Sequence, residues 1–169
     1  MKELLLDYAN YNFWANEKIL AALEKVDPKL IDKEVKGCFK SLRKTIYNIW
    51  NAETLWFSRL ANEKFEGWPS EIFKGNFSEL KQLVLAQSLK FKTYVMNRDP
   101  EQLAAPVSYI DNEGIKFTLQ AFRIFMHCMN HSNFHRGQIV TTSRNLGIKQ
   151  IPYTDYISYT LETTNANAG

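Results

Sequence analysis

The amino-acid sequence predicts an all-α protein, a four-helix bundle with a short β-hairpin-like connection before its last long helix. Four long stretches repeat apolar residues at the spacing of helical turns. Residues that cap or end helices bound these stretches, as Ser41 and Asp27-Pro28 do. Before the fourth stretch the pattern changes to a strand-like alternation around a turn. Helices with one apolar face bury it against each other, and four of them form a bundle.

The first helix is expected from Lys2 to about Val26, because Asp27-Pro28 cannot continue it. Residues 29–40 form a connection. Ser41 is a good N-cap for the second helix, which spans Leu42 to about Leu60. Glu53 is the one polar member of the apolar side of this helix.

The third helix is expected from Glu79 to about Met96, with Ser78 as its cap, after a loop over 62–76. Gln87 interrupts its apolar stripe. Pro106 to Phe117 has the pattern of a short hairpin around the turn Asp111–Gly114.

The fourth long helix follows the hairpin, from about Thr118, and ends at Gly147, a residue that favours the left-handed helix stop. A short helix is expected over 154–162. With 169 residues and 45% hydrophobic content, the chain fits one domain over residues 1–162. Residues 163–169 are expected to form a flexible tail.

The composition excludes several classes of protein. A net charge of +3 without a basic stripe argues against nucleic-acid binding. No apolar run reaches the length of a membrane span, and the first residues are too polar for a secretory signal. Cys38 and Cys128 match no paired motif, which fits free, buried thiols in a reducing compartment. We therefore expect a cytoplasmic protein that binds neither membrane nor nucleic acid.

All three histidines of the chain lie in the fourth helix, at His127, His131 and His135. Residues four apart share one face of a helix, with a drift of about 40° per step. Two imidazoles one turn apart can bind the same metal ion, while a third ligand comes from another helix and a water or substrate takes the fourth position. The alternative is that the histidines only form hydrogen bonds within the bundle.

The two residues after His135 each allow two interpretations. Arg136 could steer an acidic substrate or form an ordinary surface ion pair. Gly137 costs helix stability, about 1 kcal/mol relative to Ala, and is expected to allow close approach of another helix; the alternative is an ordinary, tolerated glycine. A di-iron carboxylate centre is excluded, since no Glu-x-x-His motif occurs.

The sequence resembles the DinB/YfiT-like family over nearly its whole length. Tyr11-Asn12-Phe13-Trp14-Ala15-Asn16 is similar to the first helix of the family, and the segments from Ser41 to Trp56 are similar to the second. The segment His131–Gln138 resembles the closing HxxxHRGQ signature, and Asp155-Tyr156 the acidic-aromatic end.

The resemblance implies a four-helix bundle that holds a divalent metal, nickel or zinc, through three histidines. Two of them correspond to His131 and His135, and the third falls on Asn48. A neutral amide binds such metals less well than imidazole does. Asn48 could complete a weakened site, His127 could substitute for it, or the site could be metal-free.

Two functions are compatible with this resemblance. The first is a metal-dependent S-transferase, in which the metal activates a low-molecular-weight thiol for attack on an electrophile. The second is a metal-free, catalytically decayed bundle that binds a small ligand or another protein. The resemblance also implies a homodimer.

Overall fold

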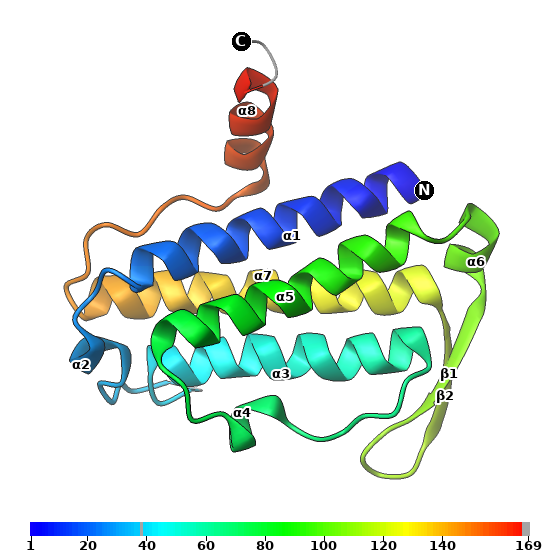
Figure 1. Cartoon of the computed structure of the whole chain (residues 1–169), viewed down its shortest axis with the longest axis horizontal. Coiled ribbons are helices and arrows are strands. Elements are labelled where there is room, and N and C mark those ends of the chain that lie inside the picture. Colours follow the sequence, from blue (N-terminus) through cyan, green and yellow to red (C-terminus); the bar gives the residue numbers. More distant parts are fainter. Residues whose placement is uncertain (38, 167–169) are drawn as a thin grey trace.

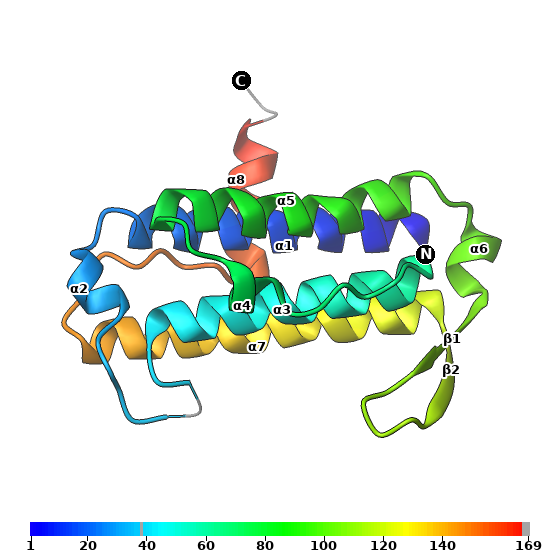
Figure 2. The ribbon, with the colours of Figure 1, turned by 60° about the horizontal axis from the view of Figure 1, so that its bottom comes forward.

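The computed structural model describes residues 1–37 and 39–166, so Cys38 lies outside the described residues. Its four long helices are α1 (Lys2–Leu23), α3 (Leu42–Ala61), α5 (Phe77–Met96) and α7 (Ala121–Asn145). They form two layers, in which α1 packs beside α5 and α3 packs beside α7 (Figure 1, Figure 2). The predicted four-helix bundle is confirmed.

The helix directions require one long return connection. Helices α1 and α7 run one way along the bundle, and α3 and α5 run the other way (Figure 1). Because α3 and α5 are parallel, residues 62–76 travel back along the whole bundle, with the short helix α4 (Pro69–Ile72) on the way. Two more short helices, α2 (Pro28–Ile31) and α6 (Pro100–Ala104), lie in segments that the sequence analysis treated as irregular. All three short helices begin with proline, which is preorganised for a first helical turn.

The predicted hairpin is confirmed, with a longer second strand than expected. Strand β1 (Pro106–Ile110) pairs antiparallel with β2 (Lys116–Gln120), so that Pro106 lies opposite Gln120. Helix α7 consequently begins at Ala121, three residues after the expected start.

Most predicted helix ends are correct. Ser41 accepts a hydrogen bond from the backbone N–H of Lys44 at 3.2 Å, as an N-cap does. The cap of α5 is Asn76 instead of Ser78, and it forms a capping box with Glu79. Gly147 has the left-handed conformation of a helix stop, with φ +82°.

The C-terminal helix α8 (Tyr156–Ala166) projects away from the bundle (Figure 1). The helix includes residues 163–166, the first part of the segment that was expected to be a flexible tail. Tyr159 anchors α8, since its buried ring packs 5.8 Å from the ring of Tyr11 and 5.5 Å from that of Trp14, between ring centroids.

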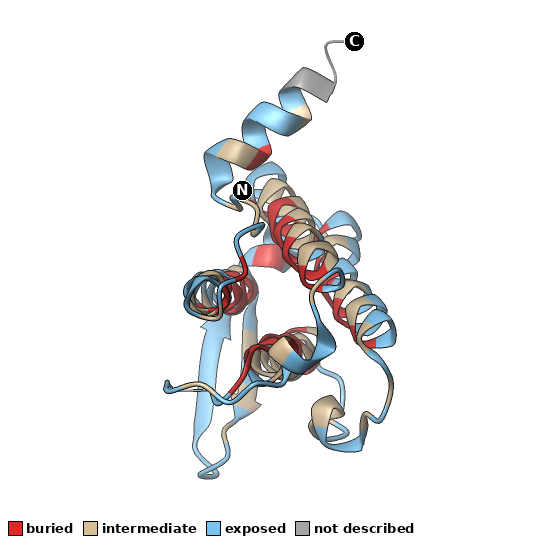
Figure 3. Cartoon of the chain, turned by 90° about the vertical axis from the view of Figure 1, so that its left-hand side faces the viewer, coloured by how far each residue is buried: buried red, intermediate tan, exposed pale blue. Residues whose placement is uncertain are grey.

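The buried residues face the centre of the bundle, as Figure 3 shows. They form two large apolar clusters, one around Phe91 and Phe125 and one around Ile19 and Leu42. On every long helix, buried polar residues stand between the positions of the two clusters, so a polar layer crosses the middle of the bundle. Its members are Asn12, Asn16, Glu53, Gln87, Ser88, Ser132 and Arg136. Among the described residues, no helix is long and apolar enough to cross a membrane.

Candidate metal centre

His131 and His135 present their Nε2 atoms to each other on the α3 side of α7. The two nitrogens are 3.1 Å apart and the ring centroids 4.3 Å apart. Two imidazole nitrogens that bind one metal, each at about 2.0–2.1 Å and at a roughly tetrahedral angle, are separated by about 3 Å. The pair therefore has the spacing of two ligands of a single ion.

Asn48 reaches this pair from α3. Its amide Nδ2 lies 3.5 Å from Nε2 of His131, because α3 and α7 pack side by side in one layer. Rotation of the amide by 180° would present its Oδ1 to the same space, so the side chain can offer an oxygen ligand. The structure thus brings together Asn48, His131 and His135.

Gln138 fixes the orientation of His135. The Nδ1–H group of His135 donates to Oε1 of Gln138 at 2.8 Å, so Nε2 carries the lone pair. Metal-binding histidines commonly use their second nitrogen in this way. The aromatic rings of Phe39 and Phe134 contact the buried His135 edge-on, at 5.2 Å and 5.0 Å between centroids.

The ring of His135 forms hydrogen bonds at both nitrogens, but the ring of His131 forms them only at Nε2 within the described part of the chain. Its Nδ1 is buried and has no hydrogen-bond partner among the described residues. Burial lowers the pKa of His131 to about 4, with smaller contributions from the neighbouring His135 and His127. The ring is therefore neutral at pH 7, as a ligand must be. In the absence of metal, the Nε2–H of His131 donates to Nε2 of His135.

His127 lies apart from the pair. Its ring centroid is 6.4 Å from that of His131 and only 4.4 Å from that of Trp56, against which it packs edge-on. Burial, and then the charge of Arg59, lowers the pKa of His127. In the part of the chain that the structure describes, no three His, Cys, Asp or Glu side chains converge as a metal site would require. Metal binding here thus depends on two histidines and the Asn48 amide.

Comparisons with known proteins identify the family of the chain. The sequence profile of the DinB family matches residues 1–166. The chain belongs to the DinB family. The protein DinB of Bacillus subtilis (strain 168) is 23% identical over 176 residues, covering 99% of this chain and all of that protein.

Solved structures of DinB-like proteins share the fold. A DinB-like protein from Bacillus cereus aligns with a TM-score of 0.68 at 16% identity, over 85% of this chain and 91% of that one. YfiT from Bacillus subtilis aligns with a TM-score of 0.63 at 13% identity, over 88% of this chain and 91% of that one. YfiT is described as a probable metal-dependent hydrolase with an unusual four-helix bundle topology.

Two interpretations of the DinB-like signature segment are wrong. Arg136 is buried, with 2% of its surface exposed, so it neither steers a substrate nor forms a surface ion pair. Its Nη1 donates to Oδ1 of Asn12 at 2.6 Å and of Asn16 at 2.9 Å. Gly137 faces outward, and a Cβ there would meet no described atom within 4 Å, so no helix approaches it closely.

The polar layer around Glu53, which is fully buried, was not predicted from the sequence. Oε1 of Glu53 accepts hydrogen bonds from Asn12, Asn16 and Ser132 at 2.9, 3.2 and 2.9 Å. Oε2 accepts from the hydroxyl of Ser88 at 2.6 Å. Two features of the sequence could have indicated this layer: Asn12 and Asn16 are four residues apart on α1, and Glu53 lies on an apolar face of α3. This layer joins all four long helices and holds the inward face of α7.

A hollow of about 540 Å³ lies beside the histidine pair. Phe39, Phe134 and Gln138 line it and also contact His135, while Thr45 lines it from α3. The hollow gives a substrate room next to the pair, with aromatic walls and amide and hydroxyl groups for hydrogen bonds.

Proposed function

We propose that this DinB-family protein binds a divalent metal, nickel or zinc, through His131 and His135, with Asn48 as a weak third ligand. We further propose that it is a thiol S-transferase of reduced metal affinity. The observation that carries the proposal is the convergence of two Nε2 atoms at 3.1 Å with the Asn48 amide beside them. A divalent metal bound there would lower the pKa of a coordinated thiol and so supply a thiolate nucleophile.

Neighbouring side chains prepare the Nε2 atoms of His131 and His135 for metal binding, because they orient the ring of His135 and keep the ring of His131 neutral. Gln138 accepts a hydrogen bond of 2.8 Å from Nδ1–H of His135, which directs the lone pair of Nε2 at the site. Burial keeps His131 neutral, and Phe39 and Phe134 limit the access of water to His135. The adjoining hollow accepts the electrophile.

Asn48 and His131 set the expected weakness of the site. An amide oxygen carries no charge and is a harder ligand than imidazole, so borderline metals bind it less tightly. In addition, metal binding at Nε2 moves the proton of His131 to Nδ1, which has no acceptor among the described residues. Both features lower affinity without removing the site.

Metal titration by calorimetry, with elemental analysis, tests the metal site. We expect the unmodified protein to bind one zinc or nickel ion and the Asn48→His variant to bind it at least about tenfold more tightly. The double variant His131→Gln/His135→Gln should bind none, whereas His127→Gln should bind as the unmodified protein does. Unmodified protein that binds no metal at millimolar concentration would exclude the metal-dependent function.

The transferase activity needs its own test. The zinc-loaded protein is incubated with a panel of low-molecular-weight thiols and a chromogenic electrophile, such as a chlorodinitrobenzene. We expect a rate that disappears in the His131→Gln/His135→Gln variant and rises in Asn48→His. Metal binding without any rate above the double variant would retain the metal site and reject the transferase.

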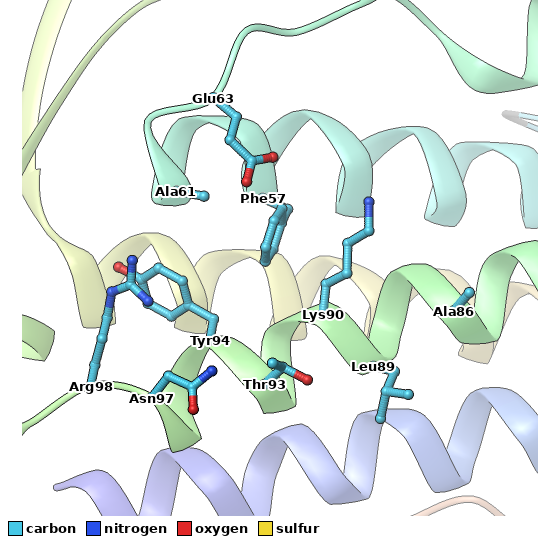
Figure 4. Close-up of a pocket in the computed structure, with 10 residues that line it drawn as sticks. All are labelled: Phe57, Ala61, Glu63, Ala86, Leu89, Lys90, Thr93, Tyr94, Asn97 and Arg98. Atoms are coloured by element: carbon cyan, nitrogen blue, oxygen red, sulfur yellow. The ribbon is translucent and has the colours of Figure 1, made fainter.

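A second function is a metal-free bundle that binds a small ligand. The His131–His135 hydrogen bond favours it, since each Nε2 atom has a partner without a metal. A pocket of about 350 Å³ between α3 and α5 offers a separate place for the ligand (Figure 4). Phe57 and Tyr94 form its apolar wall. Lys90 and Arg98 bring two positive charges against the one negative charge of Glu63, and this balance suits an aromatic carboxylate. Salicylate should raise the melting temperature of the unmodified, chelator-treated protein if this alternative is correct. The Arg98→Ala substitution should abolish that increase.

A further inference from the structure

Strand β2 is a sheet edge that no other strand pairs with among residues 1–37 and 39–166. It pairs with β1 on one side, and all five of its residues are exposed. Figure 3 shows β2 in the colour of exposed residues along its whole length, as the outer strand of the hairpin. Phe117 and Leu119 keep 40% and 39% of their surfaces exposed, which is high for residues of a strand that packs in a core.

The hairpin register shows which backbone groups point to this free edge. The N–H of Ala121 donates to the carbonyl of Ala105 at 2.9 Å, and the N–H of Asp111 donates to that of Ile115 at 3.0 Å. Hydrogen-bonded pairs alternate with non-bonded pairs in an antiparallel ladder. The intervening bonded pairs are therefore Val107–Leu119 and Tyr109–Phe117.

The even-numbered residues of β2 consequently point their backbone groups outward. Lys116, Thr118 and Gln120 each direct an N–H and a carbonyl away from β1, at the free edge. Pro106 has no N–H and lies opposite Gln120, which agrees with a non-bonded pair there. The free edge thus offers three donors and two free acceptors, since the carbonyl of Gln120, the N-cap of α7, accepts the first hydrogen bond of that helix.

Strand β2 has few of the features that prevent edge-to-edge pairing. Natural edge strands are protected by prolines, bulges, several charges or a covering segment. Strand β2 has a single charged residue, Lys116, and its register with β1 has no bulge. On one face, Phe117 stacks on Tyr109 with ring centroids 5.7 Å apart, and Leu119 lies opposite Val107. An apolar face accompanies the free backbone groups.

We propose that β2 pairs antiparallel with β2 of a second copy of this chain, about a two-fold axis through Thr118. Thr118 then lies opposite Thr118 of the second copy, Lys116 opposite Gln120, and Phe117 opposite Leu119. All outward-pointing residues fall into hydrogen-bonded pairs, as the antiparallel ladder requires. The result is a continuous four-stranded sheet with β1 at each outer side.

The sequence of β2 favours a second copy as its partner. Read antiparallel to itself, Lys-Phe-Thr-Leu-Gln places an apolar residue opposite an apolar one and keeps the two lysines apart. An isologous contact of this kind closes with two subunits. A two-stranded hairpin is marginally stable alone, and two further strands stabilise it. Because five residues bury less than the roughly 1,200 Å² of a standard interface, the dimer should be reversible.

Amide hydrogen exchange of the full chain tests the register. The amides of Phe117 and Leu119 bond to β1 and should be protected at every protein concentration. The amides of Lys116, Thr118 and Gln120 should exchange fast in dilute protein and at least about tenfold more slowly at high concentration. Outward amides that exchange equally fast at all concentrations would exclude pairing with a second copy.

Sedimentation equilibrium of matched variants tests the same contact by mass. Thr118→Pro removes the central outward N–H but no bond to β1, and Thr118→Lys keeps the N–H and places two charges opposite each other. Both should weaken dimerisation at least about tenfold. Ser108→Ala is the control, since it loses the Ser108–Thr118 hydroxyl contact of 2.8 Å without touching the edge. A dimer that both Thr118 variants retain, with circular dichroism unchanged, would overturn the proposal.

Discussion

Helix α7 carries two pairs of polar residues with the same spacing and opposite uses. Ser132 and Arg136 face the centre of the bundle, where they bond to residues of α1 and α3. His131 and His135 face the outer side towards α3, where their nearest nitrogen partners are each other and the Asn48 amide. One face of α7 fixes the helix in the bundle, and the neighbouring face presents two nitrogens to a single point.

The difference between the two pairs distinguishes polar residues that stabilise the fold from polar residues that can bind a ligand. The inward pair belongs to a layer in which Glu53 accepts four hydrogen bonds and faces Arg136 across two asparagines. In the outward pair, burial keeps His131 neutral, and Nδ1 of His131 is left without a partner among the described residues. Nε and Nη2 of Arg136 also have no hydrogen-bond partner among the described residues, but they are N–H donors and cannot bind a cation. Converging imidazole nitrogens have lone pairs and can bind one.

The largest expected effect is at Glu53. Glu53→Ala removes the acceptor of four hydrogen bonds and leaves the buried guanidinium of Arg136 without its counter-charge. We expect a loss of about 3–5 kcal/mol in the free energy of unfolding, measured by urea denaturation. Glu63→Ala, at an exposed site, should change it by less than about 0.5 kcal/mol.

A double-mutant cycle sharpens this test. If Glu53 and Arg136 act as one unit, Glu53→Gln/Arg136→Met should cost clearly less than the sum of the two single variants. Additive costs would show that the layer is not an electrostatic unit.

The next effect is the acid sensitivity of the outward pair. The pKa of His131 is about 4 in the folded chain, against about 6.5 in the unfolded chain, so the unfolded state takes up the proton first. The stability that this difference represents is complete above pH 6.5 and is lost as the pH falls to 4. Because His131 is only partly buried, the loss should be well below the roughly 3.4 kcal/mol that this pKa difference corresponds to. Between pH 6.5 and pH 4, the free energy of unfolding of the chelator-treated protein should fall further than that of its His131→Gln variant, and the difference should equal this contribution. Parallel stability curves for the two proteins would contradict the burial argument.

The two faces of α7 also differ in how far the sequence predicts them. The spacing of the histidines predicts that His131 and His135 share one face of α7, because residues four apart lie one helical turn apart. Asn48 lies on another helix, and only the family resemblance points to it. The buried role of Arg136 was not predictable from its neighbours, since a charged residue beside a site is compatible with solvent, substrate or core. It depends on Asn12, Asn16 and Glu53, which meet it only when helices distant in sequence pack together.

The same limit explains the differences in the fold. Local signals gave the long helices and the hairpin, and tertiary contacts decided the exact ends. Helix α8 continues past residue 162 because Tyr159 packs against Tyr11 and Trp14, which lie on a helix near the other end of the chain.

A smaller effect is expected at Gln138, which contacts His135 of the histidine pair and not the polar layer. Gln138→Ala removes the acceptor that orients His135, so metal affinity should fall about tenfold. We expect this in the Asn48→His background, where binding is tight enough for an accurate titration. The free energy of unfolding of the metal-free protein should change by about 1 kcal/mol at most. A loss of stability without a loss of affinity would assign Gln138 to the fold.

The smallest effect on metal binding is expected at His127, the histidine whose ring packs on Trp56 at 4.4 Å. His127→Ala removes this contact, which should cost about 1 kcal/mol of stability. Metal affinity should change by less than about twofold, since the ring does not converge with His131 and His135. A tenfold loss of affinity would mean that His127 turns towards the ion when it binds. In that case the periodicity of three histidines, and not the pair with Asn48, would define the metal site.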